Sequence, residues 1–308
     1  MKMIYFIYSV LPLFFISFPA QAQFEIEKES LRQPAREWKE YKKESYTSLG
    51  CTIETRWFTG WDPATQKASG REVHIFRPEN PGKDRPVILL PPTGGMNFLD
   101  RQMGKYFCSR NVTFYILAQF DGFADKDYDL RRHDRQIRGN TAALKELIQW
   151  IHQPVNLMGA SLGALYAAAA MGADPQIEKV VLTVGGVDLA GILTDSQLES
   201  VTVQKINRKE IYHLTSDADY LQLMKKSIHY DPGIFLSEEK NSERFLLFLS
   251  SEDTDVPTPY QKSLAEQLPK AKKTYFEAGH LWTVIRTYLF HREEIFNFFS
   301  VQHSEAKN

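Results

Sequence analysis

Hydrophobic residues change their spacing near Arg85. From there to the C-terminus, short and continuously apolar runs alternate with segments of helical spacing, such as Leu144, Leu147, Ile148 and Ile151. Continuously apolar runs are typical of parallel strands that are buried on both faces. The pattern therefore predicts an α/β fold, a mostly parallel sheet with helices on both faces. The predicted parallel strands are residues 86–92, 112–118, 155–160, 179–186, 244–251 and 273–279, and a last helix is predicted at 281–301.

The chain before Arg85 follows a different pattern. Residues 51–58 and 71–78 alternate apolar and polar side chains, which predicts an antiparallel pair of strands at the start of the sheet. Residues 23–50 are charged and lack strong periodicity, so we interpret them as an N-terminal extension of a domain that spans 51–308. Within this extension, the segment EWKEYKKES at 37–45 predicts a surface helix or a linker.

One interval, at about 192–242, interrupts the alternation of strands and helices. It is polar, contains helical pieces such as SDADYLQLMKKSIHY, and is too long for a simple crossover between two strands. Binding sites of parallel sheets lie at the carboxyl ends of the strands. We therefore expect this interval to be a small cap that is inserted over those ends.

The first 22 residues have the pattern of a secretory signal peptide. Lys2 supplies a positive charge, an apolar run begins at Ile4, and Ala20-Gln21-Ala22 fits an A-x-A cleavage site. An uncleaved anchor helix is the alternative, but the run is short and contains two prolines. No second apolar run approaches the length of a membrane span. We expect an exported protein, periplasmic or secreted, with no stable membrane span after cleavage.

The two cysteines, Cys51 and Cys108, leave two alternatives open. An exported chain permits a disulfide between them. Two buried free thiols are the other possibility, because Cys108 lies in an apolar stretch. The sequence does not supply the Cα separation that decides between them.

The overall composition is that of an ordinary globular protein. The chain has 308 residues, of which 43% are hydrophobic and 24% charged. Its formal net charge of −1 gives no reason to expect nucleic acid as a partner. The sequence also lacks a phosphate-binding G-x-x-x-x-G-K-[ST] loop and any His/Cys cluster with metal-ligand spacing, so we expect neither a cofactor nor a metal.

The segment Gly159-Ala160-Ser161-Leu162-Gly163 lies where a predicted strand turns into an alanine-rich helix. It matches G-x-S-x-G, in which a strained turn presents the serine hydroxyl above the sheet edge. The flanking residues are small because the strand and the helix pass close to the turn. A glycine-softened helix start without chemistry is the alternative. We predict that Ser161 is a nucleophile.

A serine hydroxyl needs a base, and the base needs an acid that orients it. Glu252, Asp253 and Asp255 follow the next-to-last predicted strand, and we select Asp253 because it comes directly after the strand end. His280 follows the last predicted strand after a glycine, and we select it as the base. The other carboxylates are interpreted as a solvated loop or as favourable charges at a helix start.

Acyl transfer also requires two N–H groups that stabilise the developing oxyanion. The backbone N–H of Leu162, next to the serine, is one predicted donor. The second is expected from the loop LLPPTGGMNF after the first parallel strand, at Gly94, Gly95 or Met96. We select Gly95. A tight turn into the next helix would use the same glycines.

With these motifs, the sequence resembles the α/β-hydrolase superfamily. The resemblance covers about residues 51–299 and rests on LLPPTGG, GASLG, SSEDTDVP and AGH in that order. It implies an eight-stranded, mostly parallel sheet with an antiparallel start and a Ser161–Asp253–His280 triad. The D-x-x-V-P form and the AGH ending are similar to those of single-domain esterases and dienelactone-hydrolase-like enzymes. Pro91-Pro92 stand where many members of the superfamily carry His-Gly, and no long lipase-type lid is evident.

The expected function is the hydrolysis of carboxylic esters, with a small-molecule acyl substrate and an acyl-enzyme intermediate. Two alternatives stay open. The same triad could cleave peptides or transfer acyl groups to another acceptor, or the chain could be a non-catalytic binding protein on a hydrolase scaffold. The natural substrate and the oligomeric state are not readable from the sequence.

Overall fold

The computed structural model describes residues 38–48, 50–62, 67–118, 129–171, 174–237 and 239–300. The predicted signal peptide at 1–22 and the extension before Trp38 lie outside the described residues.

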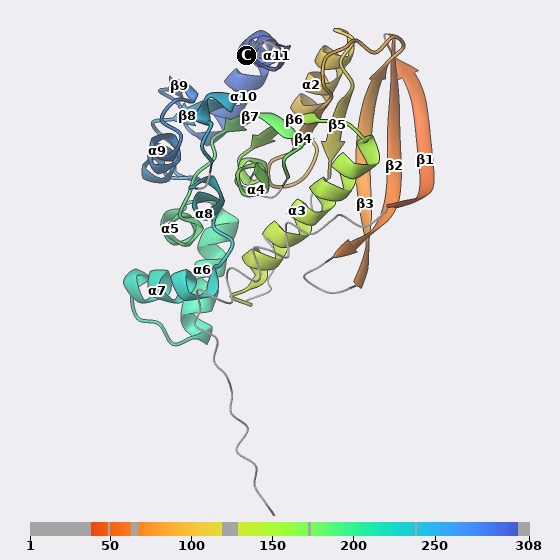
Figure 1. Ribbon diagram of the computed structural model, residues 1–308. Coiled ribbons are helices and arrows are strands. Elements are labelled where there is room, and N and C mark those ends of the chain that lie inside the picture. The colour runs from red at the N-terminus through yellow and green to blue at the C-terminus, as the bar shows by residue number, and fades with distance from the viewer. Residues whose placement is uncertain are drawn as a thin grey trace, which may run out of the picture.

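A nine-stranded sheet forms the centre of the molecule (Figure 1), with the strand order β1-β2-β3-β5-β4-β6-β7-β8-β9. The pairs from β1 to β5 are antiparallel, and all pairs from β5 to β9 are parallel. The structure thus confirms the α/β class and the antiparallel start. The strands are β1 (Lys39–Ser48), β2 (Cys51–Asp62), β3 (Lys67–Pro78), β4 (Val87–Leu90), β5 (Phe114–Leu117), β6 (Val155–Ala160), β7 (Ile177–Thr183), β8 (Phe245–Ser250) and β9 (Lys272–Phe276).

The sheet has nine strands where eight were expected, and the additional strand is β1. The sequence predicts a helix or a linker here, but Lys39–Ser48 pairs along its length with β2 at one edge of the sheet. Nine of its ten residues are exposed, so it has no buried face and no alternation that sequence patterning could detect. It is held by backbone pairing and by ion pairs across the strands, such as Lys43–Glu54 at 3.0 Å.

Helices cover both faces of the sheet because successive strand residues point to opposite sides. On one face, Ile88 and Leu90 pack in a core with α3, α4 and α9. On the other face, Val87 and Leu89 pack in a second core with α2, α10 and α11. The helices described are α2 (Phe98–Cys108), α3 (Arg132–Ile151), α4 (Leu162–Met171), α5 (Leu189–Asp195), α6 (Glu199–Ile211), α7 (Asp217–Ser227), α8 (Pro232–Leu236), α9 (Thr258–Gln267), α10 (His280–Phe290) and α11 (Arg292–Ser300), with a 3₁₀ turn at Ser242–Arg244.

The end of the chain also differs from the prediction. The single helix expected at 281–301 is two helices, because α10 ends at Phe290 and α11 begins at Arg292. The His291 backbone (φ −111°, ψ 7°) lies outside the helical region. The His291 ring packs on Phe248, with ring centroids 5.3 Å apart.

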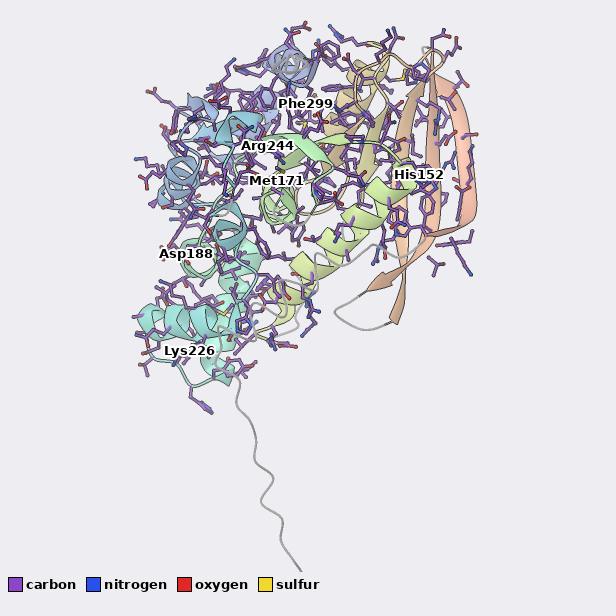
Figure 2. All side chains as sticks on the ribbon, viewed as in Figure 1. His152, Met171, Asp188, Lys226, Arg244 and Phe299 are labelled. Atoms are coloured by element: carbon purple, nitrogen blue, oxygen red, sulfur yellow. A yellow bond between two sulfur atoms is a disulfide. The ribbon has the colours of Figure 1, made fainter. Side chains whose placement is uncertain are left out.

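The interval between β7 and β8 contains α5, α6, α7 and α8. The segment α8 packs on α4, so this part of the interval belongs to the helical layer on the sheet. The helices α6 and α7 lie farther from the sheet (Figure 1). In Figure 2, Lys226 lies at this end of the molecule and Phe299 lies toward the opposite end. Between them, the Arg244 guanidinium contacts the Met171 sulfur at 3.6 Å. The role of the interval as a cap stays a prediction.

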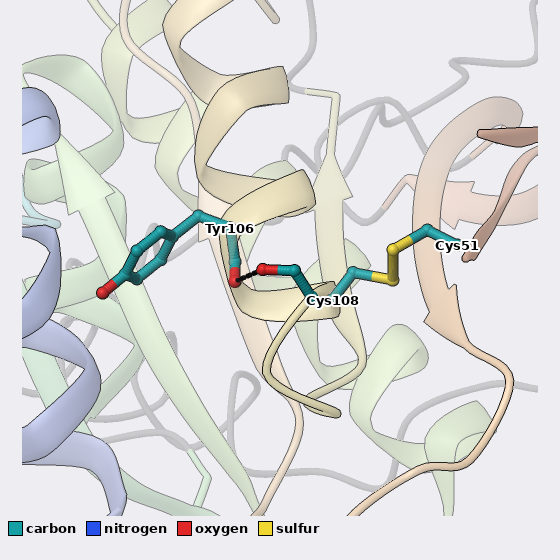
Figure 3. Close-up of a disulfide and its surroundings, with 4 residues drawn as sticks. Cys51, Tyr106 and Cys108 are labelled. Carbon is teal, nitrogen blue, oxygen red and sulfur yellow. Dashed lines mark hydrogen bonds between the residues drawn. A yellow bond between two sulfur atoms is a disulfide. The ribbon is translucent and has the colours of Figure 1, made fainter. Parts of the chain in front are cut away.

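A disulfide joins the start of β2 to the end of α2 (Figure 3). It links Cys51 and Cys108, whose Cα atoms are 6.2 Å apart. Both residues are almost fully buried. Next to Cys108, the Ser109 hydroxyl donates to the Tyr106 carbonyl at 2.8 Å, which gives a carbonyl in the last turn of α2 a hydrogen-bond partner. Of the two alternatives that the sequence left open, the structure contains the disulfide.

Among the helices of the described residues, none combines the length and the apolar character that a bilayer span requires.

Candidate functional site

Ser161 lies on the sharp turn between β6 and α4. Its φ of 53° places it in the left-handed region, which is uncommon for a residue with a side chain. Its backbone N–H donates to the Thr183 carbonyl of β7 at 2.9 Å, which ties the turn to the neighbouring strand. The Ser161 hydroxyl is thereby presented at the carboxyl end of β6.

The two flanking glycines are required by close approach of backbone atoms. A Cβ added to Gly159 would overlap the Gly163 carbonyl, and a Cβ added to Gly163 would overlap the carbonyl oxygen of Leu90. Neither obstacle is a movable side chain. The geometry thus gives a physical reason for the G-x-S-x-G spacing that sequence analysis singled out.

Asp253 lies in the loop between β8 and α9. Of the three carboxylates considered from the sequence, it alone is buried, while Glu252 is exposed and Asp255 is half-buried. Its Oδ1 accepts the backbone N–H groups of Asp255 at 2.8 Å and Val256 at 3.0 Å. These bonds turn Oδ2 toward the loop that follows β9.

His280 connects the other two residues. It is the first residue of α10, with Nδ1 2.7 Å from Asp253 Oδ2 and Nε2 2.8 Å from Ser161 Oγ. A carboxylate only accepts hydrogen bonds, so the neutral imidazole carries its proton on Nδ1. The Nε2 lone pair is then free to accept the Ser161 hydroxyl proton. The structure brings Ser161, Asp253 and His280 into one hydrogen-bonded chain.

The loops that carry Asp253 and His280 are also bound to each other. The Ser250 hydroxyl, at the end of β8, donates to the Ala278 carbonyl two residues before His280. Ser250 is almost fully buried. Sequence analysis missed this residue, and also Gln261, whose side chain reaches Asp253 from α9. Both contacts join segments that are distant in sequence, and no local pattern marks them.

The N–H groups of the two predicted oxyanion donors, Leu162 and Gly95, differ in their hydrogen bonding. Leu162 is the first residue of α4, so its N–H has no acceptor within the helix. Gly94 and Gly95 have φ values of 93° and 83°, which favour glycine at both positions. The Gly95 N–H donates to the Pro92 carbonyl at 3.2 Å. Gly95 can serve as the second donor only if this turn opens, so its role stays a prediction, with Gly94 and Met96 as the alternatives.

The described residues contain no group of three or more His, Cys, Asp or Glu side chains that could hold a metal ion. The chemistry that the arrangement can perform is proton transfer from a hydroxyl to an imidazole that is oriented by a carboxylate.

Comparison with known proteins gives a result at the level of structure only. No family profile matches the sequence, and no curated protein matches it significantly. Acetyl xylan esterase 1 from Thermoanaerobacterium sp. superposes with a TM-score of 0.60 over 92% of this chain and 98% of that chain, at 13% identity. An acetyl xylan esterase from Paenibacillus sp. R4 gives 0.66 over 90% and 92%, at 13% identity.

The described architecture and these superpositions agree. The chain has the α/β-hydrolase fold. A 2,6-dihydroxy-pseudo-oxynicotine hydrolase is also similar, with a TM-score of 0.55 over 91% of this chain and 72% of that chain, at 14% identity. In this α/β-hydrolase fold, Ser161, Asp253 and His280 follow the carboxyl ends of β6, β8 and β9, so parallel strands deliver all three to one edge of the sheet.

Proposed function

We propose that the protein is a serine hydrolase that cleaves carboxylic esters of small molecules. The observation that carries the proposal is the continuous hydrogen-bonded chain from Ser161 Oγ through His280 to Asp253 Oδ2, with links of 2.8 and 2.7 Å. The strained turn that presents Ser161 supports it. The esterases and the hydrolase among the structurally similar proteins support the reaction class.

In the proposed mechanism, Ser161 Oγ attacks the ester carbonyl carbon while its proton passes to His280 Nε2. Asp253 holds the imidazole and stabilises the imidazolium that forms. The Leu162 N–H and a second amide of the 94–96 loop stabilise the oxyanion. His280 then gives its proton to the leaving alcohol, which departs and leaves an acyl-serine. Water attacks this ester, its proton passes to His280, and collapse of the intermediate releases the acid and returns the proton to Ser161.

A fluorophosphonate probe tests the nucleophile, because only an activated serine reacts with it. We expect labelling of the wild-type protein and none of Ser161→Ala, with hydrolysis of p-nitrophenyl esters reduced by at least about a thousandfold. Ser237→Ala, at an exposed serine in the interval between β7 and β8, is the matched control and should keep full activity. Turnover retained by a folded Ser161→Ala variant would remove Ser161 from its role.

Substrate tests on the same purified protein distinguish an esterase from a peptidase, an acyltransferase and a binding protein. Hydrolysis of p-nitrophenyl esters in preference to aminoacyl amides supports an esterase. Faster cleavage of the amides supports a peptidase, and product that grows with an added alcohol acceptor supports an acyltransferase. A wild-type protein that is neither labelled nor active would be a binding protein.

We also propose that the protein acts outside the cytoplasm. The signal-peptide pattern of residues 1–22 motivates this, and the Cys51–Cys108 disulfide supports it because such bonds persist in oxidising compartments. Expression with residues 1–22 should yield a chain whose N-terminus is Gln23 in the periplasm or medium. An uncleaved chain in the cytoplasm would contradict the proposal.

A further inference from the structure

Gln261 is a buried residue in the first turns of α9, and its side chain points back into the loop that carries Asp253. Only 1% of its surface is exposed. Burying a primary amide is unfavourable unless its hydrogen-bonding groups find partners. The partners of Gln261 therefore show what its burial accomplishes.

All the hydrogen-bonding directions of this amide are fixed. Its Oε1 accepts the backbone N–H of Ser250 at 2.9 Å, a group that can only donate. Its Nε2 donates to the Val256 carbonyl at 2.8 Å and to Asp253 Oδ2 at 2.7 Å, two groups that can only accept. A flipped amide would place a donor against a donor and an acceptor against two acceptors. The Gln261 N–H must therefore point at Asp253.

This bond completes the set of donors around Asp253. An ionised carboxylate offers about four lone-pair sites. Asp253 Oδ1 receives the N–H groups of Asp255 and Val256, and Oδ2 receives those of Gln261 and His280. The buried carboxylate is thus satisfied as an anion by four donors, of which three are in place without His280. Any proton that moved onto Asp253 would displace one of them.

We propose that Gln261 is a positioning residue, which holds the Asp253 carboxylate in the one orientation that receives the Nδ1–H of His280. This inference rests on the function proposed above. Gln261 acts through Asp253 on the direction of the imidazole and on the stability of the imidazolium. Its amide also joins the end of β8 to the start of α9, so the position of Asp253 is set by two elements of the scaffold and not by its loop alone.

The conservative variant Gln261→Glu tests this role, because it keeps the shape of the side chain and an acceptor for Ser250. The carboxyl group that this substitution introduces can donate to Asp253 only while it is protonated. Once it is ionised, two carboxylates face each other and the orientation of Asp253 is lost. We expect kcat for p-nitrophenyl acetate to fall at least about tenfold near pH 8, with KM changed less than about twofold. We also expect activity to recover as pH is lowered, which gives the variant an alkaline limb that wild type lacks.

Gln267→Glu, at an exposed position of the same helix, is the matched control and should keep the wild-type profile. Gln261→Met is the second variant, which removes the donor without adding charge and should lower kcat at every pH without the new limb. Circular dichroism and thermal melting verify folding at each pH.

The outcomes separate this proposal from the proposed function. Wild-type labelling by the fluorophosphonate probe reports on Ser161, independently of any Gln261 variant. Folded Gln261→Glu and Gln261→Met with wild-type kcat and wild-type pH profiles would overturn the positioning role. Loss of folding in both variants would also overturn it, because Gln261 would then be a structural residue only.

Discussion

The Cys51–Cys108 disulfide permits a quantitative prediction about stability. The bond closes a loop with a sequence separation of 57 residues, which contains β2, β3, β4 and α2. A cross-link of this kind restricts the unfolded chain more than the folded one. For a loop of this length, the chain-entropy relation gives about 4 kcal/mol of stabilisation at 25 °C. Since 1 kcal/mol corresponds to a few degrees in a chain of this size, the bond should raise Tm by roughly 10 °C.

The perturbation is the double substitution Cys51→Ala/Cys108→Ala, compared with wild type in the oxidised and the reduced state. Both cysteines are nearly buried, so alanine introduces no unpaired polar group. Thermal and urea unfolding followed by circular dichroism measure the difference in stability. Thiol titration and intact mass establish the oxidation state of each sample.

Three strands (β3, β5 and β4) separate β2 from β6, which carries Ser161 at its end. We therefore expect ester hydrolysis at 25 °C to be unchanged in the double variant while it remains folded. Equal midpoints for oxidised wild type and the double variant, with the bond verified by mass, would refute the entropic reasoning. Two titratable thiols in the oxidised, unfolded protein would refute the bond itself.

Two further substitutions test a close backbone contact beside Ser161 and the buried carboxylate of Asp100. Gly163→Ala places a methyl group against the Leu90 carbonyl, so we expect a loss of about 1–3 kcal/mol and of most esterase activity. In the control Gly70→Ala, the added Cβ would meet only the Tyr41 hydroxyl oxygen, at an ordinary contact distance of 3.8 Å, so this variant should lose neither. A fully active Gly163→Ala would contradict the required close approach. Burial raises the pKa of Asp100 to about 6, above its value in the unfolded chain. At neutral pH the ionised carboxylate therefore lowers the free energy of unfolding. This destabilisation disappears as pH falls from about 7 to 4, where the carboxyl becomes protonated in the folded protein. Asp100→Asn should remove this pH dependence and add up to about 3 kcal/mol at pH 8 in urea unfolding, and a variant with the wild-type pH slope would rule out Asp100 as its source.

The sequence was sufficient for the parallel part of the fold because its strands are buried on both faces. Residues such as those of β4 and β8 are all buried, and this gives the continuously apolar runs from which the strands were predicted. Ser161, Asp253 and His280 could be selected for a related reason. Each follows a recognisable strand end, and parallel topology brings those ends together.

The features that sequence analysis missed depend on contacts between distant segments. The strand β1 has no hydrophobic face, so only its pairing with β2 reveals it. Gln261 and Gln267 lie on the same helix and are indistinguishable in a single sequence. Their difference arises because the turn after β8 brings Ser250, Asp253 and Val256 around the first residue and not the second.

The charged strand β1 also has a consequence for self-association. An open sheet edge exposes unpaired backbone groups, to which a second chain can add a strand. At this edge, lysine and glutamate side chains follow one another closely, from Lys39 and Glu40 to Lys42, Lys43 and Glu44, all exposed. An approaching strand would have to remove water from these charges before it could pair. Among the strands that the structure describes, β1 is the outermost on this side of the sheet, and its charges therefore oppose the sheet-to-sheet growth that leads to aggregation.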